Sequence, residues 1–487
     1  MVEGLTESYF RVNTLVNQQL LSYNKFLDVG IQQVVDRIGK IQTNVEGFEL
    51  KLGKVRIEQP RYYEVKGGYR QILPNEARLR NLGYSAPIFL EIVPVFNGVE
   101  RPVYSDVFIG ELPVMLKSKL CYLSGMRKSE LVENGEDPDD PGGYFIINGT
   151  ERTLIIVEDL APNRIVTTKE TILGKDVILA KVFSVRQGFR SRVTVEKREV
   201  AGGGTLFASF PGIPNRIPLT TLMTALGLSD EEILGLFEDS ETQIEVKTNL
   251  ELKPMTQEEA FEYLGKRAGA GHAKQYQATR ANQVINNFLL PHIGNGEANR
   301  RAKAIYLGIM AKKVLELDSG VRNKDDKDHY SNKRLRLAGD LMQELFRVSF
   351  NKIARDIKYQ LEKQHARHRQ INVKTAVRSN NLTESISYAL ATGNWTGGRS
   401  GVSQVLDRTN YLSYVAHQRR VSSLLSRSHP HFEARDLHAT QFGRVCPNET
   451  PEGQNCGLVK NLAIGAVISA NTDEAPIEKY LREFGVK

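Results

Sequence analysis

Apolar residues recur at helical spacing in two long stretches of the chain. Between residues 9 and 38 they stand three and four apart and Gly39 follows them, which predicts an amphipathic helix ending at Gly39. The same spacing after residue 339 predicts a second, longer helix with a wide buried face. The apolar positions of that face are Leu341, Leu345, Phe346, Val348, Phe350, Ile353, Ile357 and Leu361.

Between these helices, apolar and polar residues alternate in several stretches, which predicts strands exposed on one face. Gly202, Gly203 and Gly204 lie between two such stretches, so they predict a hairpin turn rather than a phosphate-binding loop before a helix. Ser229 to Glu232 has the spacing of a capping box and predicts the start of a helix running toward Phe237. The predicted strands include 48–57, 88–93, 177–185, 191–197 and 206–210.

Length and composition predict a soluble protein of about three domains, because 487 residues exceed the size of one common core. The longest apolar run near the C-terminus, 462–470, is too short to span a bilayer, and the N-terminus has no signal pattern. We therefore expect a cytoplasmic protein with no membrane partner. The odd number of cysteines, Cys121, Cys446 and Cys456, predicts reduced thiols and no zinc site.

The net charge of +8 favours an acidic partner, and nucleic acid is the first candidate, although ribosome-associated and membrane-surface proteins share this property. The segment from 397 to 462 is dense in arginine, whose planar guanidinium matches phosphate oxygens and stacks on bases. Its cationic and imidazole side chains are Arg399, Arg408, Arg419, Arg420, Arg427, Arg435, Arg444, His417, His429, His431 and His438.

Acidic residues cluster in a loop rich in proline and glycine, 133–143. Such a cluster suggests a metal site, but its spacing fits neither a calcium loop nor an inward-facing triad. We therefore interpret the loop as an exposed turn. Its five carboxylates belong to Glu133, Glu136, Asp137, Asp139 and Asp140.

Some residues outside these segments fit two roles each. Arg78, Arg80 and Lys117 fit a solvated basic surface, or a contact with DNA or a neighbouring subunit. Trp395 is the single tryptophan, and we expect it to anchor packing rather than to stack on a base.

Four motifs near the C-terminus occur in a fixed order: SGVSQVLDR, HQRR, RDLHATQFGRVCP and ETPEGQNCGLVKNL. Each alone fits a turn-rich surface segment, but together they resemble the fork region of the second-largest subunit of multisubunit DNA-dependent RNA polymerases, in its archaeal and eukaryotic form. The segments 88–93, 107–123, 143–155, 325–339 and 387–395 are similar to other parts of that subunit. The resemblance covers nearly the whole chain and is weakest between about 166 and 320.

This resemblance implies an α+β, multidomain fold of mixed helices and antiparallel sheets. The implied domains are a first part of the protrusion at 1–165, the lobe at 166–325, a second part of the protrusion at 326–385, the fork at 386–465, and the start of the external region at 466–487, continued in a separate chain.

The resemblance also implies a role in transcription, as a nucleotidyltransferase subunit that forms one side of the DNA cleft and the fork near the active centre. Nucleotidyl transfer needs clustered aspartates that hold metal ions, and the sequence shows no such cluster at i, i+2 and i+4. In the resembling family, Mg²⁺ is held by the largest subunit. We therefore expect no catalytic residue and no metal ligand in this chain, which would act only in the assembled enzyme.

The sequence stops shortly after the fork motifs, which resembles the split form of this subunit in methanogens and related archaea. There an N-terminal chain, B″, pairs with a C-terminal chain, B′; a fragment of a longer subunit is the alternative. The implied partners are B′, the largest-subunit chains, other polymerase subunits, the DNA template and the RNA–DNA hybrid.

Motif by motif, the resemblance assigns the residues that line the active centre and its nucleic acid. Gln404 and Arg420 line the RNA side of the main channel, supported by His417 and Arg419. Arg427 lies in a loop, 423–432, at the downstream edge of the bubble. The full set is Gln404, Arg408, His417, Arg419, Arg420, Arg427, Glu452 and Gln454.

Two other classes of function stay open at this point. The first is a nucleic-acid-binding scaffold outside transcription, which fits the charge but not the order of the four motifs. The second is a self-contained nucleotidyltransferase that uses the acidic loop near Asp137, against which the missing aspartate cluster argues.

Overall fold

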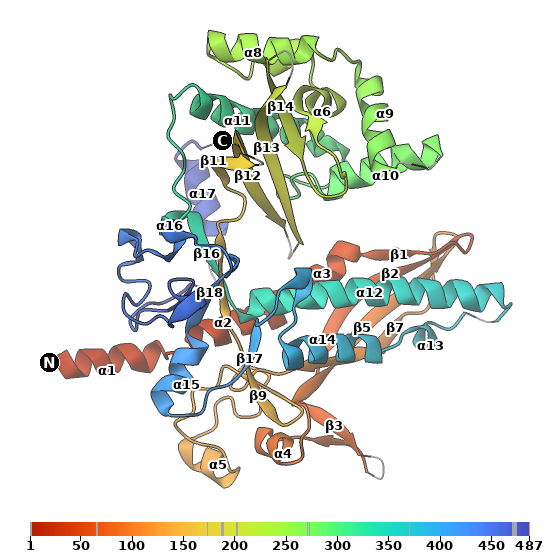
Figure 1. Ribbon diagram of the computed structural model, residues 1–487. Coiled ribbons are helices and arrows are strands. Elements are labelled where there is room, and N and C mark those ends of the chain that lie inside the picture. Colours follow the sequence, from red (N-terminus) through yellow and green to blue (C-terminus); the bar gives the residue numbers. More distant parts are fainter. Residues whose placement is uncertain are drawn as a thin grey trace. The chain divides into compact units, whose positions relative to one another are not determined.

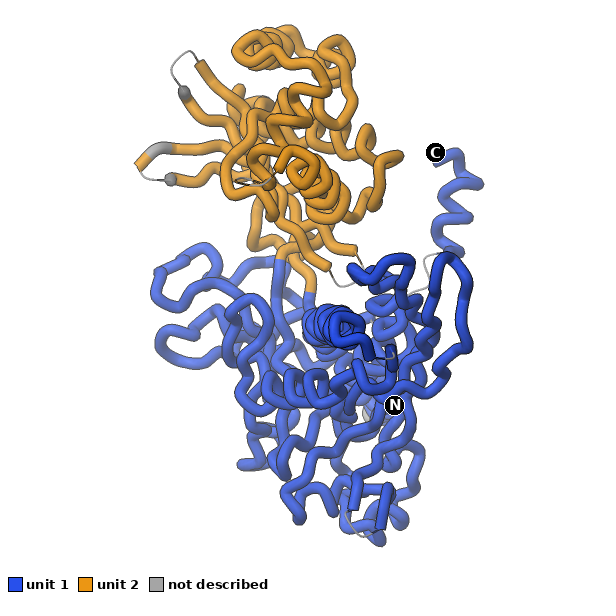
Figure 2. Tube along the Cα trace, turned by 90° about the vertical axis from the view of Figure 1, so that its right-hand side faces the viewer, with its two compact units in different colours: residues 1–159, 335–487 blue, residues 160–334 orange. Residues whose placement is uncertain are grey.

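The computed structural model describes residues 2–64, 67–172, 174–186, 189–200, 203–269, 271, 273–369, 371–469 and 475–486. The chain forms two compact units, which Figure 2 shows in different colours. Unit 1 comprises 1–159 and 335–487, and unit 2 comprises 160–334. Helices and antiparallel sheets occur in both units, so the α+β prediction is confirmed. The segment expected to form the lobe, 166–325, lies within unit 2.

Every strand pair in the main sheet of unit 1 is antiparallel, and β5 pairs with β2, β6 and β7. A β-bulge between Leu52 and Val55 interrupts the predicted strand 48–57 without ending it. The buried side chains of this sheet belong to the largest core of the unit. The strands are β1 (Lys40–Gln42), β2 (Phe48–Ile57), β5 (Ser85–Phe96), β6 (Val99–Glu100) and β7 (Tyr104–Pro113).

The predicted helix between 9 and 38 is present only in part, because the chain leaves the helical conformation between α1 (Val2–Val12) and α2 (Asn17–Lys25). A π-helical turn, η1 (Phe26–Gly30), joins α2 to α3 (Ile31–Ile38). The helix ends at Gly39, as predicted, because the φ of +60° there suits glycine.

The second predicted helix is confirmed as α12 (Ala338–Ala366), the long helix across unit 1 in Figure 1. Leu345 is buried in the core with the other predicted positions, but Val348 is 40% exposed, so its assignment to the buried face was wrong. Gly339 begins this helix against α2, where its N–H donates to Ser22 Oγ at 3.0 Å. A side chain at Gly339 would collide with the Ser22 backbone carbonyl, so only glycine fits.

Two small sheets bring distant segments of the chain together. In one, the strand order is β16 (Lys333–Arg336), β10 (Ile156–Leu160), β18 (Arg420–Ser423) and β19 (Val459–Asn461), and β10 runs parallel to β18. In the other, β9 pairs with both β8 and β17. Its strands are β8 (Phe145–Ile147), β9 (Thr150–Leu154) and β17 (Ser403–Val405).

Unit 2 has one antiparallel sheet and a separate core, built from the inner face of the sheet and the helices that pack on it. The three predicted strands of this region are confirmed, and β13 pairs with β14 as the predicted hairpin, although Gly202 lies outside the described residues. The Ser229 capping box is confirmed, but its helix ends at Leu234, before Phe237. The elements are β11 (Ile165–Ile172), β12 (Lys175–Arg186), β13 (Phe189–Val200), β14 (Gly203–Ser209), β15 (Ile217–Pro218), α6 (Leu219–Ala225), α7 (Asp230–Leu234), α8 (Ser240–Glu251), α9 (Gln257–Ala268), α10 (Lys274–Asn287), η2 (Glu297–Asn299) and α11 (Arg300–Asp318).

Trp395 is 5% exposed and packs into the large core of unit 1. The remaining elements are short, apart from the two helices α14 and α17. None of the helices in the described ranges has the length and apolar character needed to cross a membrane. These elements are β3 (Arg61–Glu64), β4 (Gly68–Gln71), α4 (Pro74–Leu79), α5 (Lys128–Glu133), η3 (Tyr330–Asn332), α13 (Val373–Ala376), α14 (Asn380–Thr392), η4 (Thr396–Gly398), α15 (Tyr411–Gln418), α16 (Phe432–Arg435), η5 (Ala439–Gln441), η6 (Gly453–Asn455) and α17 (Ala475–Glu483).

Candidate nucleic-acid interface

The predicted site is built around α15 and β18, which follow one another in the chain. The side chain of Asn410 caps α15 by accepting a hydrogen bond from the Ser413 N–H at 2.8 Å. The helix ends at Gln418, and β18 begins two residues later and pairs with β19, so that Arg420 stands opposite Asn461. The HQRR motif therefore spans the end of a helix and the start of a strand.

His417 and Gln404 are in direct contact. His417 Nδ1 accepts a hydrogen bond from the Asp407 backbone N–H at 3.1 Å, which leaves the ring proton on Nε2. That Nε2–H donates to Gln404 Oε1 at 3.0 Å. Burial, and then the positive charge of Arg420, lower the pKa of His417 to about 4. The imidazole is thus neutral at pH 7, and it orients the Gln404 amide.

Arg420 differs from the other predicted arginines. Its guanidinium is half-buried at the start of β18, and it makes no hydrogen bond or ion pair with any residue that the structure describes. Its charge nevertheless reaches His417, whose pKa it helps to lower. Arg420 is therefore a cation whose donors are available to a ligand.

Arg419, the neighbouring residue, is used inside the protein. It is 5% exposed, and its guanidinium donates at 2.7 Å both to the Leu15 carbonyl and to the Ala463 carbonyl. Burial lowers the pKa of Arg419. This side chain ties the N-terminal segment to the segment after β19, so it fits the predicted supporting role better than a contact with nucleic acid.

Arg408 is held by acidic residues from distant parts of the chain. Its Nε donates to Glu151 Oε2 at 2.7 Å, and its Nη2 donates to Asp140 Oδ2 at 3.1 Å. The guanidinium also lies 4.3 Å from the centroid of the Tyr414 ring. Burial opposes the charge of Arg408, but these hydrogen bonds and ion pairs outweigh burial and raise its pKa. The predicted contact of Arg408 with nucleic acid would have to compete with these partners.

The acidic loop takes part in the same network. Glu136 and Asp140 are each 8% exposed, so the interpretation of the loop as an exposed turn was wrong for these two residues. Arg78 donates to Glu136 at 2.9 Å and to Glu151 at 2.8 Å, so it is not part of a solvated basic surface. No group of three potential metal ligands occurs among the described residues. The buried acids of this loop accept hydrogen bonds from arginines, and these contacts explain why the acids are buried without invoking a metal ion.

Arg427 and Arg435 both donate to backbone carbonyls of the loops after β18. Arg427 donates to the carbonyl of Ser423, the last residue of β18, at 3.0 Å and to the carbonyl of Leu425, in its own loop, at 2.8 Å. Arg435 was not among the predicted site residues, and carbonyl acceptors leave no pattern in a sequence that would have indicated its contacts.

Glu452 and Gln454 lie exposed on the turn of the ETPEG motif. The Thr450 hydroxyl closes this turn by donating to the Val459 carbonyl and accepting from the Gly457 N–H, each at 2.9 Å. Neither the Glu452 nor the Gln454 side chain has a hydrogen-bond partner in the described part of the chain. Both are therefore available to another molecule.

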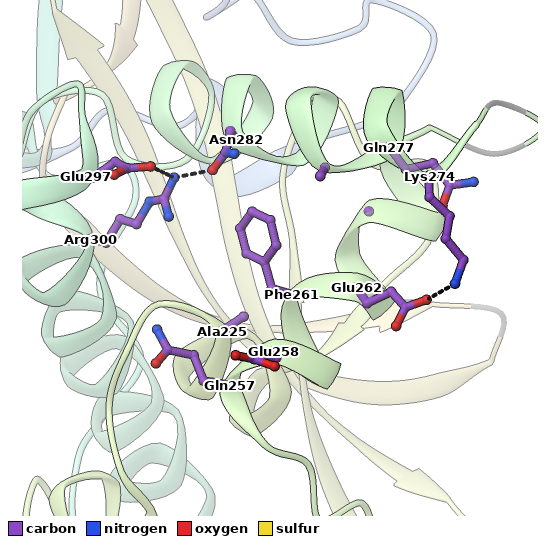
Figure 3. A pocket seen from close by; sticks show the side chains of 12 residues that line it. Ala225, Gln257, Glu258, Phe261, Glu262, Lys274, Gln277, Asn282, Glu297 and Arg300 are labelled. Atoms are coloured by element: carbon purple, nitrogen blue, oxygen red, sulfur yellow. Dashed lines mark hydrogen bonds and ion pairs between the residues drawn. The ribbon is translucent and has the colours of Figure 1, made fainter.

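A hollow of about 660 Å³ lies elsewhere, in unit 2 between α9 and α10, and Figure 3 shows Phe261 projecting into it. Its two cations are neutralised by its own carboxylates, since Lys274 pairs with Glu262 at 3.7 Å and Arg300 with Glu297 at 3.2 Å. None of the predicted site residues lines it. The hollow is thus a poorer candidate for a polyanion than the surface around Arg420.

The neutral state of His417 predicts a pH effect on stability. The unfolded chain protonates this histidine near pH 6.5, whereas the folded chain does so only near pH 4. The free energy of unfolding should therefore fall as the pH drops from 6.5 to 4, by up to about 3 kcal/mol. Urea titrations at several pH values, followed by Trp395 fluorescence, measure the free energy of unfolding. In His417→Gln, the decrease in this free energy between pH 6.5 and 4 that is due to His417 should disappear. Equal pH slopes for both proteins would contradict the buried neutral imidazole.

Comparison with known sequences identifies the family. Residues 14–384 match the family described as RNA polymerase beta subunit, and residues 404–468 match the family described as RNA polymerase Rpb2, domain 3. The chain belongs to the RNA polymerase beta subunit family. All eight predicted site residues lie inside the Rpb2 domain 3 match, although their contacts with nucleic acid stay a prediction.

Individual members of this RNA polymerase family align with nearly the whole chain. The DNA-directed RNA polymerase subunit Rpo2N of Methanococcus vannielii is 49% identical over 99% of this chain and 98% of its own length. Rpo2N of Methanocaldococcus jannaschii is 47% identical over 100% of this chain and 99% of its own length. The subunit Rpo2 of Saccharolobus shibatae is 48% identical over 99% of this chain, but the match covers only 43% of that longer protein.

Proposed function

We propose that this chain is B″, the N-terminal half of the second-largest subunit of a DNA-directed RNA polymerase, and that it acts in the cytoplasm as part of the assembled enzyme. The full-length similarity to proteins named Rpo2N supports this assignment. The partner that supplies the remainder of this subunit is a second chain, B′, as the full-length match to proteins named Rpo2N supports. The largest-subunit chains and the other polymerase subunits are the further partners.

Within that enzyme, the chain forms one side of the DNA cleft and a fork that contacts the RNA–DNA hybrid. The observation that carries this proposal is the Arg420 guanidinium, which has no partner among the described residues and stands beside the neutral His417. A cation in this setting binds a phosphate, while Arg408, Arg419 and Arg427 maintain the shape of the surface.

RNA synthesis also needs Mg²⁺, and the described residues of this chain do not fit it. The two most buried acids of the acidic loop, Glu136 and Asp140, bind Arg78 and Arg408. No group of three potential ligands is present in the described ranges. We therefore assign the ions to the largest subunit, and this chain contributes positioning and charge rather than metal chemistry.

An RNA-extension assay tests the assignment. The purified chain with template, primer, ribonucleoside triphosphates and Mg²⁺ should show no extension, and extension should appear when B′ and the other subunits are added. Extension by the chain alone would support the self-contained nucleotidyltransferase. An assembled enzyme that is equally active without the chain would support a scaffold outside transcription.

In the same assay, Arg420→Ala should lower extension at limiting nucleotide about tenfold, the effect of losing one charge-assisted hydrogen bond. The affinity for the hybrid should also depend less on salt, because one fewer phosphate is neutralised. At pH 7, where His417 is neutral, the free energy of unfolding should change by less than about 1 kcal/mol, because the guanidinium makes no hydrogen bond or ion pair with a described residue. Arg367→Ala, at an exposed arginine beyond α12, is the control. Unchanged extension by Arg420→Ala would exclude the phosphate contact.

A further inference from the structure

Arg435 lies at the end of the short helix α16, between two loops of the predicted site. We name residues 424–431 the first loop and residues 449–458 the second loop. Arg435 Nε donates to the Pro430 carbonyl of the first loop at 2.6 Å. Its Nη1 donates to the Gln454 carbonyl at 2.8 Å and to the Cys456 carbonyl at 2.7 Å, both in the second loop. A longer contact, 3.5 Å, joins its Nη2 to the His429 carbonyl.

One guanidinium thus binds four backbone carbonyls, two from each loop. This arrangement needs donors that point in several directions within one plane, which the guanidinium provides. A lysine ammonium carries the same charge on a single nitrogen and cannot reach both loops with this geometry. The contacts of Arg435 therefore depend on the shape of the group as well as on its charge.

The backbone of Arg435 also packs tightly against the second loop. Gly457 has a φ of +71°, and a Cβ at this position would collide with the main chain of Arg435. The loop can approach this closely only because residue 457 is glycine. This close approach brings the Gln454 and Cys456 carbonyls within hydrogen-bonding distance of the Arg435 guanidinium.

We infer that Arg435 is a positioning residue, which clasps the first loop to the second loop and so fixes Arg427 relative to Glu452 and Gln454. This inference deepens the proposed function and rests on it for its effect on RNA synthesis. The clasp itself does not depend on it. The density of arginine in this segment favours a polyanion, but the guanidinium of Arg435 donates to backbone carbonyls instead.

Hydrogen–deuterium exchange on the full chain tests the clasp directly. Arg435→Ala and Arg435→Lys should both speed amide exchange roughly tenfold in the two loops together. Arg444→Ala is the matched control, because the Arg444 guanidinium donates, within the described residues, only to the Thr440 carbonyl four residues away. It should leave both loops unchanged. Exchange that stays at the wild-type rate in Arg435→Lys, or that changes in one loop alone, would overturn the clasp.

The assembled enzyme provides the second test. Arg435→Lys and Arg435→Ala should lower RNA extension to the same extent, while the salt dependence of hybrid binding stays at the wild-type slope. Recovery of wild-type extension in Arg435→Lys, together with a smaller salt slope in Arg435→Ala, would show a phosphate contact and overturn the proposal. If the wild-type assembly itself fails to extend RNA, the proposed function fails, and the exchange experiment still decides the clasp.

Discussion

Leu345→Asp should prevent unit 1 from folding. Leu345 is 4% exposed on α12, in the core that this helix shares with the main sheet and with α14. The substitution removes a buried side chain and places a carboxylate there without a partner, at an expected cost of more than about 5 kcal/mol. That cost is comparable with the whole stability of a typical domain. Fluorescence of Trp395, which lies in the same core, should resemble that of the unfolded chain without any denaturant.

Val348→Asp is the matched control, because it introduces the same carboxylate three residues further along the same helix. Val348 is 40% exposed, so the free energy of unfolding of this variant should lie within about 1 kcal/mol of the wild-type value. Unit 2 has its own core and should keep its helical circular dichroism in both variants. A soluble Leu345→Asp chain with native Trp395 fluorescence would show that the buried face of α12 has been assigned incorrectly.

The sequence predicted those elements in which one side packs on a large core, because such packing places apolar residues at regular intervals. The spacing of apolar residues located α12 because one side of that helix packs along its length. It failed at Val348, since an apolar residue at the edge of the stripe is compatible with either face. It also joined α1 to α2, because spacing alone does not show where a helix is interrupted.

Contacts between distant residues could not be predicted in this way. Arg78 looked like a surface cation because its partners, Glu136 and Glu151, are 58 and 73 residues away. The parallel pairing of β10 with β18 joins Ile156 to Val421, and no local pattern indicates that register. An arginine that the sequence suggests is a free positive charge can therefore be neutralised by an acidic residue far away in the chain.

The motifs proposed the candidate site, but the contacts within it needed the structure. The order of the four motifs indicated the correct family, and the segment that holds the candidate site matches RNA polymerase Rpb2, domain 3. The motifs assigned Arg420 to the channel and Arg419 to its support, but they did not show the contacts behind these roles: Arg419 is buried and donates to carbonyls, whereas the Arg420 guanidinium has no partner among the described residues. Two adjacent residues of the same type differ because one ends a helix against the protein and the other begins a strand.

A buried ion pair joins the strands on either side of β18. Lys460 on β19 and Glu158 on β10 are 7% and 5% exposed, and Lys460 Nζ lies 3.1 Å from one carboxylate oxygen of Glu158 and 3.2 Å from the other. Because β18 lies between these two strands, the pair also restrains the strand that carries Arg420. The lysine of the ETPEGQNCGLVKNL motif is therefore engaged inside the protein.

Removing one partner of this pair should destabilise unit 1 strongly. Lys460→Met removes the ammonium that lies against the buried Glu158 carboxylate, and Glu158→Gln removes the carboxylate charge that faces Lys460, so each should cost about 3–5 kcal/mol. Replacing both residues together should cost much less than the sum, because no uncompensated charge stays buried. Urea unfolding followed by Trp395 fluorescence gives the three values. Additive losses would mean that the two groups do not interact in solution, and β18 would then be held by its backbone hydrogen bonds alone.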